Sequence, residues 1–219
     1  MPAKMTDPPR PLIYRFLYRA TQWFTLFCLK ILFRYQYKHV SKLPLTGGAL
    51  ICPNHFSHLD PMMIGCVVRR RVSFLTKKAL FDNKILGWYL TILQCIPIDR
   101  EATGIGGMKE TLKRLKKKES VVLFPEGERS WDGNLLPLMK GFTALVKRVK
   151  VPIVPAGIHG THEAWPRGKN MFKLRPIKLV FGDPIPYSDI EDMDEDQMAE
   201  YVGAKIAECY EQAREWNSK

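Results

Sequence analysis

From residue 48 onward, short apolar runs alternate with longer segments of helical periodicity, and this alternation restricts the fold more than any other feature. Runs of strand length are expected at residues 48–53, 72–76, 94–98, 120–124, 151–156 and 177–181. Helices are expected at residues 61–70, 81–92, 102–118, 139–149 and 194–216. Strands that alternate with helices form layered α/β folds with a largely parallel sheet. The sequence therefore predicts an α/β domain over residues 38–219, with a largely parallel central sheet flanked by helices and an acidic C-terminal helix.

Residues 1–37 precede this pattern and are expected to form a tail and an N-terminal amphipathic helix over residues 12–37. Its longest uncharged run, Ala20–Leu29, is shorter than the about 20 apolar residues that a membrane span requires. A helix lying in the headgroup plane fits better, and the alternative is a helix packed on the protein's own core. The polar stripe holds Arg15, Arg19, Gln22, Lys30 and Arg34, and the apolar side chains are Leu12, Ile13, Phe16, Trp23, Phe24, Phe27 and Ile31.

The charge of the chain favours an anionic partner. The net charge is +12, and the basic residues are concentrated before residue 183, whereas the segment that follows is acidic. Phospholipid surfaces, phosphorylated substrates and nucleic acids all attract such a body. The sequence contains neither zinc-finger spacing nor an evident RNP-type signature, so no nucleic-acid partner is expected. The five cysteines are not paired as CxxC, which indicates reduced, buried thiols in a cytosolic compartment, and no signal peptide is recognised.

A histidine and an aspartate follow the apolar run at residues 49–52. His55 and Asp60 are five positions apart, so on one continuous helix they would point about 140° away from each other. A loop between them would let them pair, and Asp60 followed by Pro61 is typical of a helix N-cap. Imidazole is a general base near neutral pH, and a carboxylate fixes its tautomer. The pattern predicts that His55 is a base that activates a substrate hydroxyl. Two alternatives stay open: Asp60 only caps the helix beside a loop histidine, or His55, His58 and Asp60 bind a metal ion.

The run at residues 121–124 leads into a polar turn with three candidate binding residues. Gly127 permits unusual backbone angles and close approach of a ligand. Arg129 can hold a phosphate through two parallel hydrogen bonds. Glu126 could orient Arg129 or accept a hydrogen bond from a substrate hydroxyl. A Pro-Glu-Gly turn by itself is common, so this motif gains weight only from its neighbours.

Two other strand ends carry basic residues. Arg100 follows the run at residues 96–98 and is a candidate second phosphate ligand, with Asp99 as its surface partner. Lys77 and Lys78 follow the run at residues 72–76 and could add positive charge, although a solvated basic turn is an equally good reading. The apolar segment Val151–Gly157 is expected to be a buried strand or the wall of an acyl pocket, and His159 and His162 after it are taken as structural.

These four segments, in this order and spacing, resemble the glycerolipid acyltransferase family, and most of all the 1-acylglycerol-3-phosphate (lysophosphatidic acid) acyltransferases. The resemblance covers about residues 38–185, and its motifs are His55 to Asp60, Ile98-Asp99-Arg100, Phe124 to Ser130 and Val151 to Pro155. It implies that His55 is the base and Asp60 its partner. It also implies that a glycerol phosphate is surrounded by Arg100, Glu126, Gly127 and Arg129.

The resemblance further implies a thioester donor, either acyl-CoA or acyl carrier protein, with no metal and no other cofactor. The acceptor would be a lysophospholipid, and the enzyme would act in phospholipid biosynthesis at the cytoplasmic face of a membrane that contains anionic lipid. Glu128 departs from the motif, where relatives often have Thr, and this leaves the acceptor open between lysophosphatidic acid, another lysolipid and glycerol 3-phosphate. The other readings are a non-enzymatic module that binds anionic lipid and a metal-dependent hydrolase.

Overall fold

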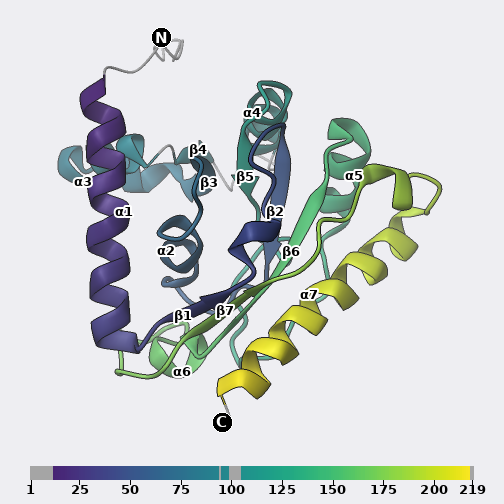
Figure 1. Cartoon of the computed structure of the whole chain (residues 1–219). Helices are drawn as coiled ribbons and strands as arrows, with labels where there is room; N and C mark the ends of the chain where they lie inside the picture. Colours follow the sequence, from purple (N-terminus) through teal and green to yellow (C-terminus); the bar gives the residue numbers. More distant parts are fainter. Residues whose placement is uncertain (1–11, 94, 99–104, 218–219) are drawn as a thin grey trace.

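A seven-stranded, mostly parallel sheet forms the centre of the computed structural model, which describes residues 12–93, 95–98 and 105–217 (Figure 1). The strand order is β1-β7-β6-β2-β5-β3-β4, and only the β6–β7 pair is antiparallel. The strands are β1 (Gln36–Lys38), β2 (Ala49–Pro53), β3 (Val72–Lys77), β4 (Ile96–Ile98), β5 (Ser120–Val122), β6 (Ile153–His159) and β7 (Lys178–Phe181). The prediction of an α/β fold with a largely parallel sheet is therefore confirmed.

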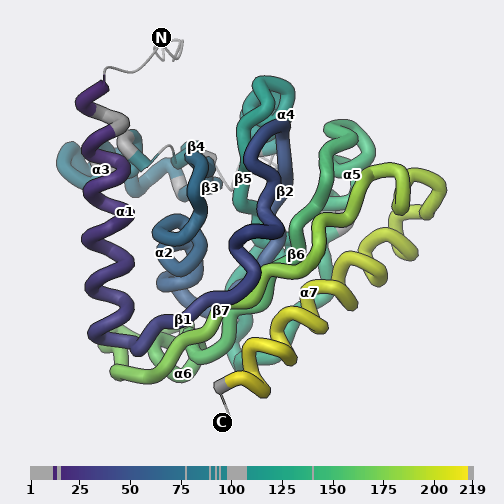
Figure 2. Tube along the Cα trace, in the orientation of Figure 1, coloured from purple at the N-terminus to yellow at the C-terminus, as the bar shows by residue number. Residues whose placement is uncertain are grey.

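Helices cover both faces of this sheet. The α-helices are α1 (Leu12–Phe33), α2 (Asp60–Gly65), α3 (Lys84–Ile92), α4 (Ile105–Lys116), α5 (Lys140–Val149), α6 (Thr161–Ala164) and α7 (Glu195–Asn217). The described ranges also contain the short 3₁₀ helices η1 (Val40–Lys42), η2 (Lys78–Phe81) and η3 (Tyr187–Asp189). In Figure 2, α1 stands at one side of the molecule, whereas α7 crosses the other side beside β6 and β7.

The core consists of two apolar clusters, one on each face of the sheet. Ile51 belongs to the cluster that includes residues of α1 and α2, whereas Leu50 and Cys52 belong to the cluster that includes residues of α4, α5 and α7. Successive side chains of a strand point to opposite faces, so one buried strand serves both clusters. This explains why the predicted strands are continuous apolar runs rather than alternating ones.

Tertiary pairing corrects several predicted boundaries. The predicted helix 12–37 ends at Phe33, where Arg34 adopts a left-handed φ of 46°, and the chain continues as β1, which pairs with β7. The predicted helix 61–70 is only six residues long. In addition, β6 runs to His159, and the short helix α6 was not predicted. Pairing between segments that are distant in sequence leaves no local signal, so β1 could not be read from the sequence.

The apolar face of α1 is exposed, and its polar stripe is turned partly inward. Trp23 is 74% exposed and Phe27 is 62% exposed, so this face does not pack on the described part of the protein. By contrast, Gln22 is buried and donates to the carbonyls of Gly65 and Val68, while Arg19 donates to the carbonyl of Arg69. Gln22 is thus turned toward α2 and the segment after it, whereas Arg19 stays exposed and its bond to Arg69 lies at the protein surface.

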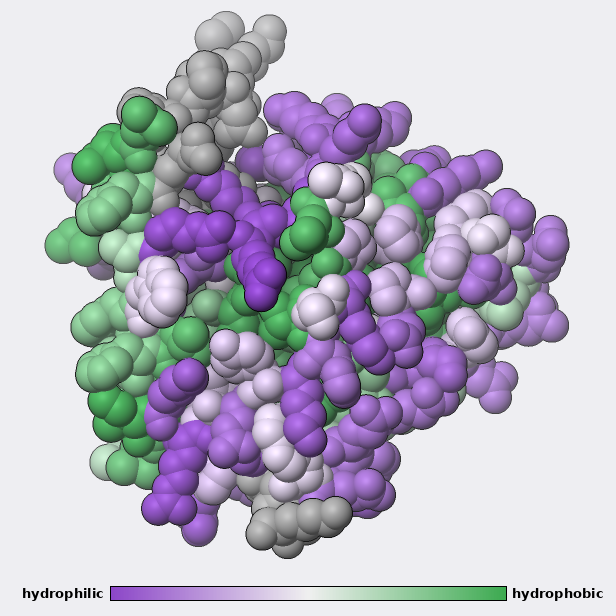
Figure 3. All heavy atoms as spheres, in the orientation of Figure 1, coloured by the Kyte–Doolittle hydropathy of each residue, from purple (hydrophilic) through white to green (hydrophobic). Residues whose placement is uncertain are grey.

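An apolar surface runs along the side of the molecule where α1 lies (Figure 3). Within the described ranges, the helices are all too short or too polar to cross a bilayer.

Candidate active site

The loop between β2 and α2 brings His55 and Asp60 into contact. The Nδ1 atom of His55 lies 2.9 Å from Oδ2 of Asp60, and the ring stacks on Phe124 with centroids 3.9 Å apart. Asp60 is fully buried, whereas the His55 side chain keeps 13% of its surface exposed. A carboxylate accepts a hydrogen bond from Nδ1–H, so the Nε2 atom is left as the basic nitrogen. The geometry is that of an oriented general base.

The Asp60 carboxylate holds this loop rather than the helix. Its Oδ2 atom also accepts hydrogen bonds from the backbone N–H groups of Phe56 and Ser57, both at 2.7 Å. The N-cap of α2 is Leu59, and no side chain caps the helix. The prediction that Asp60 is the N-cap is therefore wrong: the carboxylate points back toward the loop, because the imidazole and two N–H groups converge on one oxygen.

Glu126 joins the loop after β5 to the histidine loop. The carboxyl group is buried, and Oε1 accepts from the His55 backbone N–H at 3.0 Å while Oε2 accepts from that of Leu136 at 3.3 Å. Burial, with a smaller contribution from the nearby Asp60, raises the pKa of Glu126 to about 8 in spite of the lowering effect of these two N–H groups. Glu126 thus contacts the backbone that carries His55, a role that the sequence did not indicate.

The turn that contains Gly127 and Arg129 lies beside the same loop. Gly127 adopts a left-handed φ of +77°, which agrees with the unusual backbone angles predicted for it. A Cβ atom at this position would lie 1.7 Å from Sδ of Met139. The N–H group of Ser130 donates to the carbonyl of His55 at 2.9 Å. Together with the Glu126 contact, this bond fixes the turn to the histidine loop. The half-buried Arg129 therefore directly precedes the residue that bonds the backbone of His55.

Arg167 is a residue of this region that the sequence did not reveal. Its Nη1 atom donates to Oε2 of Glu128 at 2.7 Å and to the carbonyl of Arg129 at 2.6 Å, and its guanidinium lies 4.0 Å from the centroid of the Trp131 ring. The Glu128 carboxylate thus has a cation as its partner. Arg167 lies 38 positions after Arg129, and no spacing rule connects them.

Two polar side chains next to the histidine loop were also missed. The amide of Asn54 is buried and bonds both the N–H and the carbonyl of Ile158 in β6. The Ser57 hydroxyl donates to the carbonyl of Trp165 at 2.7 Å. The first pair of bonds fixes the start of the loop to β6, and the second bond fixes its middle to Trp165, just after α6. Asn54 and Ser57 are both part of the His55 motif, and their position in that motif was the sequence signal that could have indicated a role.

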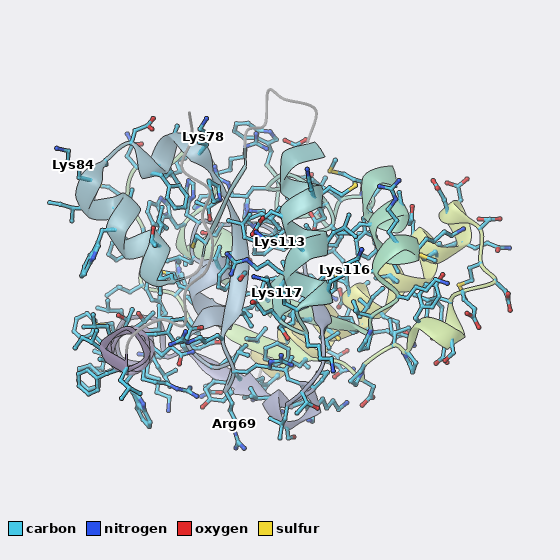
Figure 4. The ribbon with its side chains drawn as sticks, turned by 90° about the horizontal axis from the view of Figure 1, so that it is seen from above. Arg69, Lys78, Lys84, Lys113, Lys116 and Lys117 are labelled. Carbon is cyan, nitrogen blue, oxygen red and sulfur yellow. The ribbon has the colours of Figure 1, made fainter. Side chains whose placement is uncertain are left out.

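Of the other predicted basic residues, Lys77, Lys78 and Arg100, the structure describes the side chain of Lys78 alone. Lys78 is exposed in η2, past the carboxyl end of β3 and two strands away from β2, and only the backbone of Lys77 is described. Arg100 lies outside the described residues. Figure 4 shows that basic side chains spread from Lys78 and Lys84 over α4 to Arg69 at the opposite edge, so positive charge is not confined to the site. Across the described ranges, His, Cys, Asp and Glu side chains form no group of three arranged to hold a metal ion.

Comparison with known proteins gives a consistent result. The sequence profile of the acyltransferase family matches residues 34–159. A 1-acyl-sn-glycerol-3-phosphate acyltransferase of Bacillus subtilis is 30% identical over 76% of this chain and 83% of its own length. The enzyme of that name from Limnanthes alba is 34% identical over 70% of this chain, which spans about half (55%) of that protein.

A solved structure agrees on the fold. The 1-acyl-sn-glycerophosphate acyltransferase of Thermotoga maritima superposes with a TM-score of 0.81 and 21% identity, over 94% of this chain and 82% of that one. The family match covers more than half of the chain and includes His55, Asp60 and the turn at Glu126. By its sequence and its fold, this chain belongs to the acyltransferase family.

Proposed function

We propose that this protein transfers a fatty acyl group from a thioester to the free hydroxyl of 1-acylglycerol 3-phosphate and so forms phosphatidic acid. The observation that carries this proposal is the contact between Nδ1 of His55 and Asp60, which leaves Nε2 as the base. The nucleophile is the substrate hydroxyl, so no nucleophilic side chain is needed. The names of the relatives from Bacillus subtilis and Limnanthes alba support this choice of acceptor. The donor is acyl-CoA or acyl carrier protein, and the reaction uses no further cofactor.

The chemistry follows from the site. The acceptor O–H gives its proton to Nε2 of His55 as its oxygen attacks the thioester carbonyl carbon. Asp60 stabilises the imidazolium that forms, as the carboxylate does in a serine protease triad. The tetrahedral intermediate then collapses, its C–S bond breaks, and the leaving thiolate takes the proton from the imidazolium. The products are the new ester and the free thiol carrier.

Arg129 is the residue proposed to hold the phosphate. It lies one residue from Ser130, whose N–H bonds the His55 carbonyl, so a phosphate on this arginine would place the glycerol near the base. A hydrogen bond to a charged group contributes about 1.5–3 kcal/mol. Arg129→Ala should therefore raise the KM for the acceptor by roughly ten- to a hundredfold. Arg129→Lys should restore only part of the acceptor affinity, because lysine lacks the planar fork of the guanidinium. A rise in the KM for the donor alone would instead assign Arg129 to the site that binds the acyl carrier.

Glu128 bears on the choice of acceptor. A free carboxylate beside Arg129 would repel a phosphate, but Arg167 pairs with Glu128 and so reduces that repulsion. This pair favours a phosphorylated acceptor in spite of the departure from the family motif. Another lysolipid and glycerol 3-phosphate are the remaining alternatives.

The decisive experiment is a panel of donors and acceptors in detergent micelles. Acyl-CoA and acyl carrier protein thioesters are each tested with lysophosphatidic acid, glycerol 3-phosphate and a choline lysolipid. We expect the highest kcat/KM with lysophosphatidic acid, and loss of nearly all activity in His55→Ala with an unchanged circular dichroism spectrum. A folded His55→Ala protein with near-normal turnover would refute the mechanism, and transfer to another acceptor would correct the substrate.

We further propose that α1 holds the enzyme at the cytoplasmic face of a membrane with anionic lipid. The exposed Trp23 and Phe27 would enter the acyl boundary, and the exposed Lys30 and Arg34 would lie toward headgroups. The five free cysteines accord with a reducing compartment. Changing Trp23 and Phe27 together to Ser should reduce binding to anionic vesicles even at high salt, because apolar burial is not screened. Unchanged binding would exclude α1 as an anchor.

A further inference from the structure

The segment between α6 and β7 carries a second exposed apolar patch next to α1. Met171 is 81% exposed and Leu174 is 62% exposed, so both large apolar side chains lie at the surface. The exposed Lys169, Lys173 and Arg175 lie among them. We call residues 169–175 the amphipathic loop. Apolar and basic side chains that alternate on a surface fit a lipid–water boundary, where the first enter the acyl region and the second reach phosphates.

The amphipathic loop is held in place by contacts to its neighbours. The Lys173 N–H donates to the carbonyl of Ala164 at 2.7 Å, and the indole N–H of Trp165 donates to the carbonyl of Lys169, also at 2.7 Å. The Phe172 ring packs between Phe33 of α1, at 5.7 Å, and Trp165, at 6.2 Å. Phe172 thus contacts α1 and Trp165 with part of its ring, since it is itself 50% exposed, and the side chains on either side of it are exposed as well.

The loop lies beside the exposed face of α1. In Figure 1 the chain between α6 and β7 passes beside the C-terminal end of α1, and in Figure 3 the apolar surface continues along that whole side of the molecule. The contact between Phe33 and Phe172 joins the two elements. A bilayer that covers the face of α1 would therefore meet the amphipathic loop as well.

The loop is also coupled to the proposed catalytic loop. The Trp165 ring lies 5.7 Å from the ring of His58, and the Trp165 carbonyl accepts from the Ser57 hydroxyl. Ser57 and His58 both lie between His55 and Asp60. A path of direct contacts thus runs from the amphipathic loop through Trp165 to the loop that carries the base.

A pocket next to the loop adds positive charge to the same region. Its volume is about 450 Å³, and its lining includes His159, Lys173 and Arg175 together with the single acid Glu163. On the α7 side, Arg214 and Glu211 form an ion pair with each other. Lys173 and Arg175 thus leave this surface with an excess of cations over Glu163, which suits an anionic headgroup.

We propose that the amphipathic loop is a second membrane-contact element, which docks on the anionic phospholipid bilayer together with α1 and holds the His55 loop at the lipid surface. This inference rests on the membrane association proposed above. One helix lying on a bilayer leaves the molecule free to rotate about the helix axis, whereas a second contact at its C-terminal end fixes one orientation. Fixing that orientation would let a lysolipid reach the base without leaving the surface.

The test uses the full-length chain and sedimentation with vesicles of phosphatidylcholine alone or with phosphatidylglycerol. Met171 and Leu174 changed together to Ser should lower the partition coefficient by about tenfold or more, at low and at high salt. Lys173 and Arg175 changed together to Ser should lower it roughly 30-fold on anionic vesicles at low salt, at about 1 kcal/mol per charge, and little on neutral ones. Leu45→Ser is the matched control for losing an exposed apolar side chain outside the amphipathic loop: Leu45 is 71% exposed in the segment before β2, and its replacement should lower the partition coefficient less than the Met171 and Leu174 changes do.

The outcomes separate this inference from the proposed function. Normal vesicle binding by Met171→Ser/Leu174→Ser would overturn it. A wild-type dimer that this variant converts to monomer without lipid would also overturn it, in favour of a protein interface. Turnover of a water-soluble, short-chain acceptor should stay within about twofold of wild type, and a large loss there would place the loop in the catalytic machinery instead. If the wild type has no acyltransferase activity, the proposed function fails, while the vesicle measurement still decides the docking surface.

Discussion

Replacing Asp60 by Asn tests how the histidine loop is built. Oδ2 of Asp60 accepts three hydrogen bonds, from Nδ1–H of His55 and from the N–H groups of Phe56 and Ser57, whereas Oδ1 is buried without a hydrogen-bond partner among the described residues. An Asn side chain has one oxygen, and that oxygen can replace Oδ2 with all three bonds kept. The amide nitrogen would then occupy the place of Oδ1.

The two backbone N–H groups should lock this orientation. A flipped Asn would turn its NH₂ group toward two donors and leave each of them unsatisfied, at about 1–3 kcal/mol per group. His55 therefore keeps its Nδ1–H tautomer, and only the negative charge is lost. A hydrogen bond to a charged group contributes about 1.5–3 kcal/mol and is about twice as strong as a neutral one, so losing the charge alone removes about half of it, roughly 0.8–1.5 kcal/mol of stabilisation of the imidazolium. We expect kcat to fall roughly four- to tenfold, well short of the roughly 10⁴-fold loss that a wrong tautomer causes in a serine protease.

Steady-state kinetics in detergent micelles measure this effect, with His55→Ala as the reference for a missing base. Thermal unfolding provides the control, since Asn should keep most of the stability, whereas Asp60→Ala strands two buried N–H groups and should be much less stable. If Asp60→Asn is as inactive as His55→Ala while it remains folded, the argument from locked orientation is wrong. An unfolded Asp60→Asn protein would contradict the preserved hydrogen bonds.

Two further predictions follow from the turn after β5. Arg167→Ala should raise the KM for the acceptor by up to about fivefold with little effect on the donor, because Glu128 loses its Arg167 partner and exposed ion pairs contribute about 0.2–1 kcal/mol. Adding Glu128→Thr should recover part of the loss, and a double variant with the same KM as Arg167→Ala would contradict this coupling. Burial raises the pKa of Glu126 from 4.5 to about 8, so the folded state binds its proton more tightly and loses stability as the pH rises through that window. The difference in melting temperature between wild type and Glu126→Gln should therefore shift against the wild type as the pH is raised from 4.5 to about 8. A difference that stays constant over this range would show that Glu126 does not titrate there.

The sequence by itself determined the class of fold and the position of the main elements. The apolar runs at β2 and β6 predict buried strands, since a strand buried on both faces has no polar side. It also predicted a loop between His55 and Asp60, because positions five apart point away from each other on a continuous helix. The first three family motifs could be read as one site because each lies at the carboxyl end of a predicted strand, and such ends of parallel strands meet at one edge of a sheet. The fourth motif, Val151 to Pro155, is instead part of a strand, as β6 shows.

The tertiary structure decided what the site residues contact. Nothing in the local sequence says that Asp60 bonds its own loop instead of capping α2, because both uses need the same residue before the same proline. Glu126 reaches the His55 backbone across 71 positions, and Arg167 reaches Arg129 across 38. Contacts at such separations depend on how the sheet arranges its strand ends, and that arrangement is fixed by the packing of the whole chain.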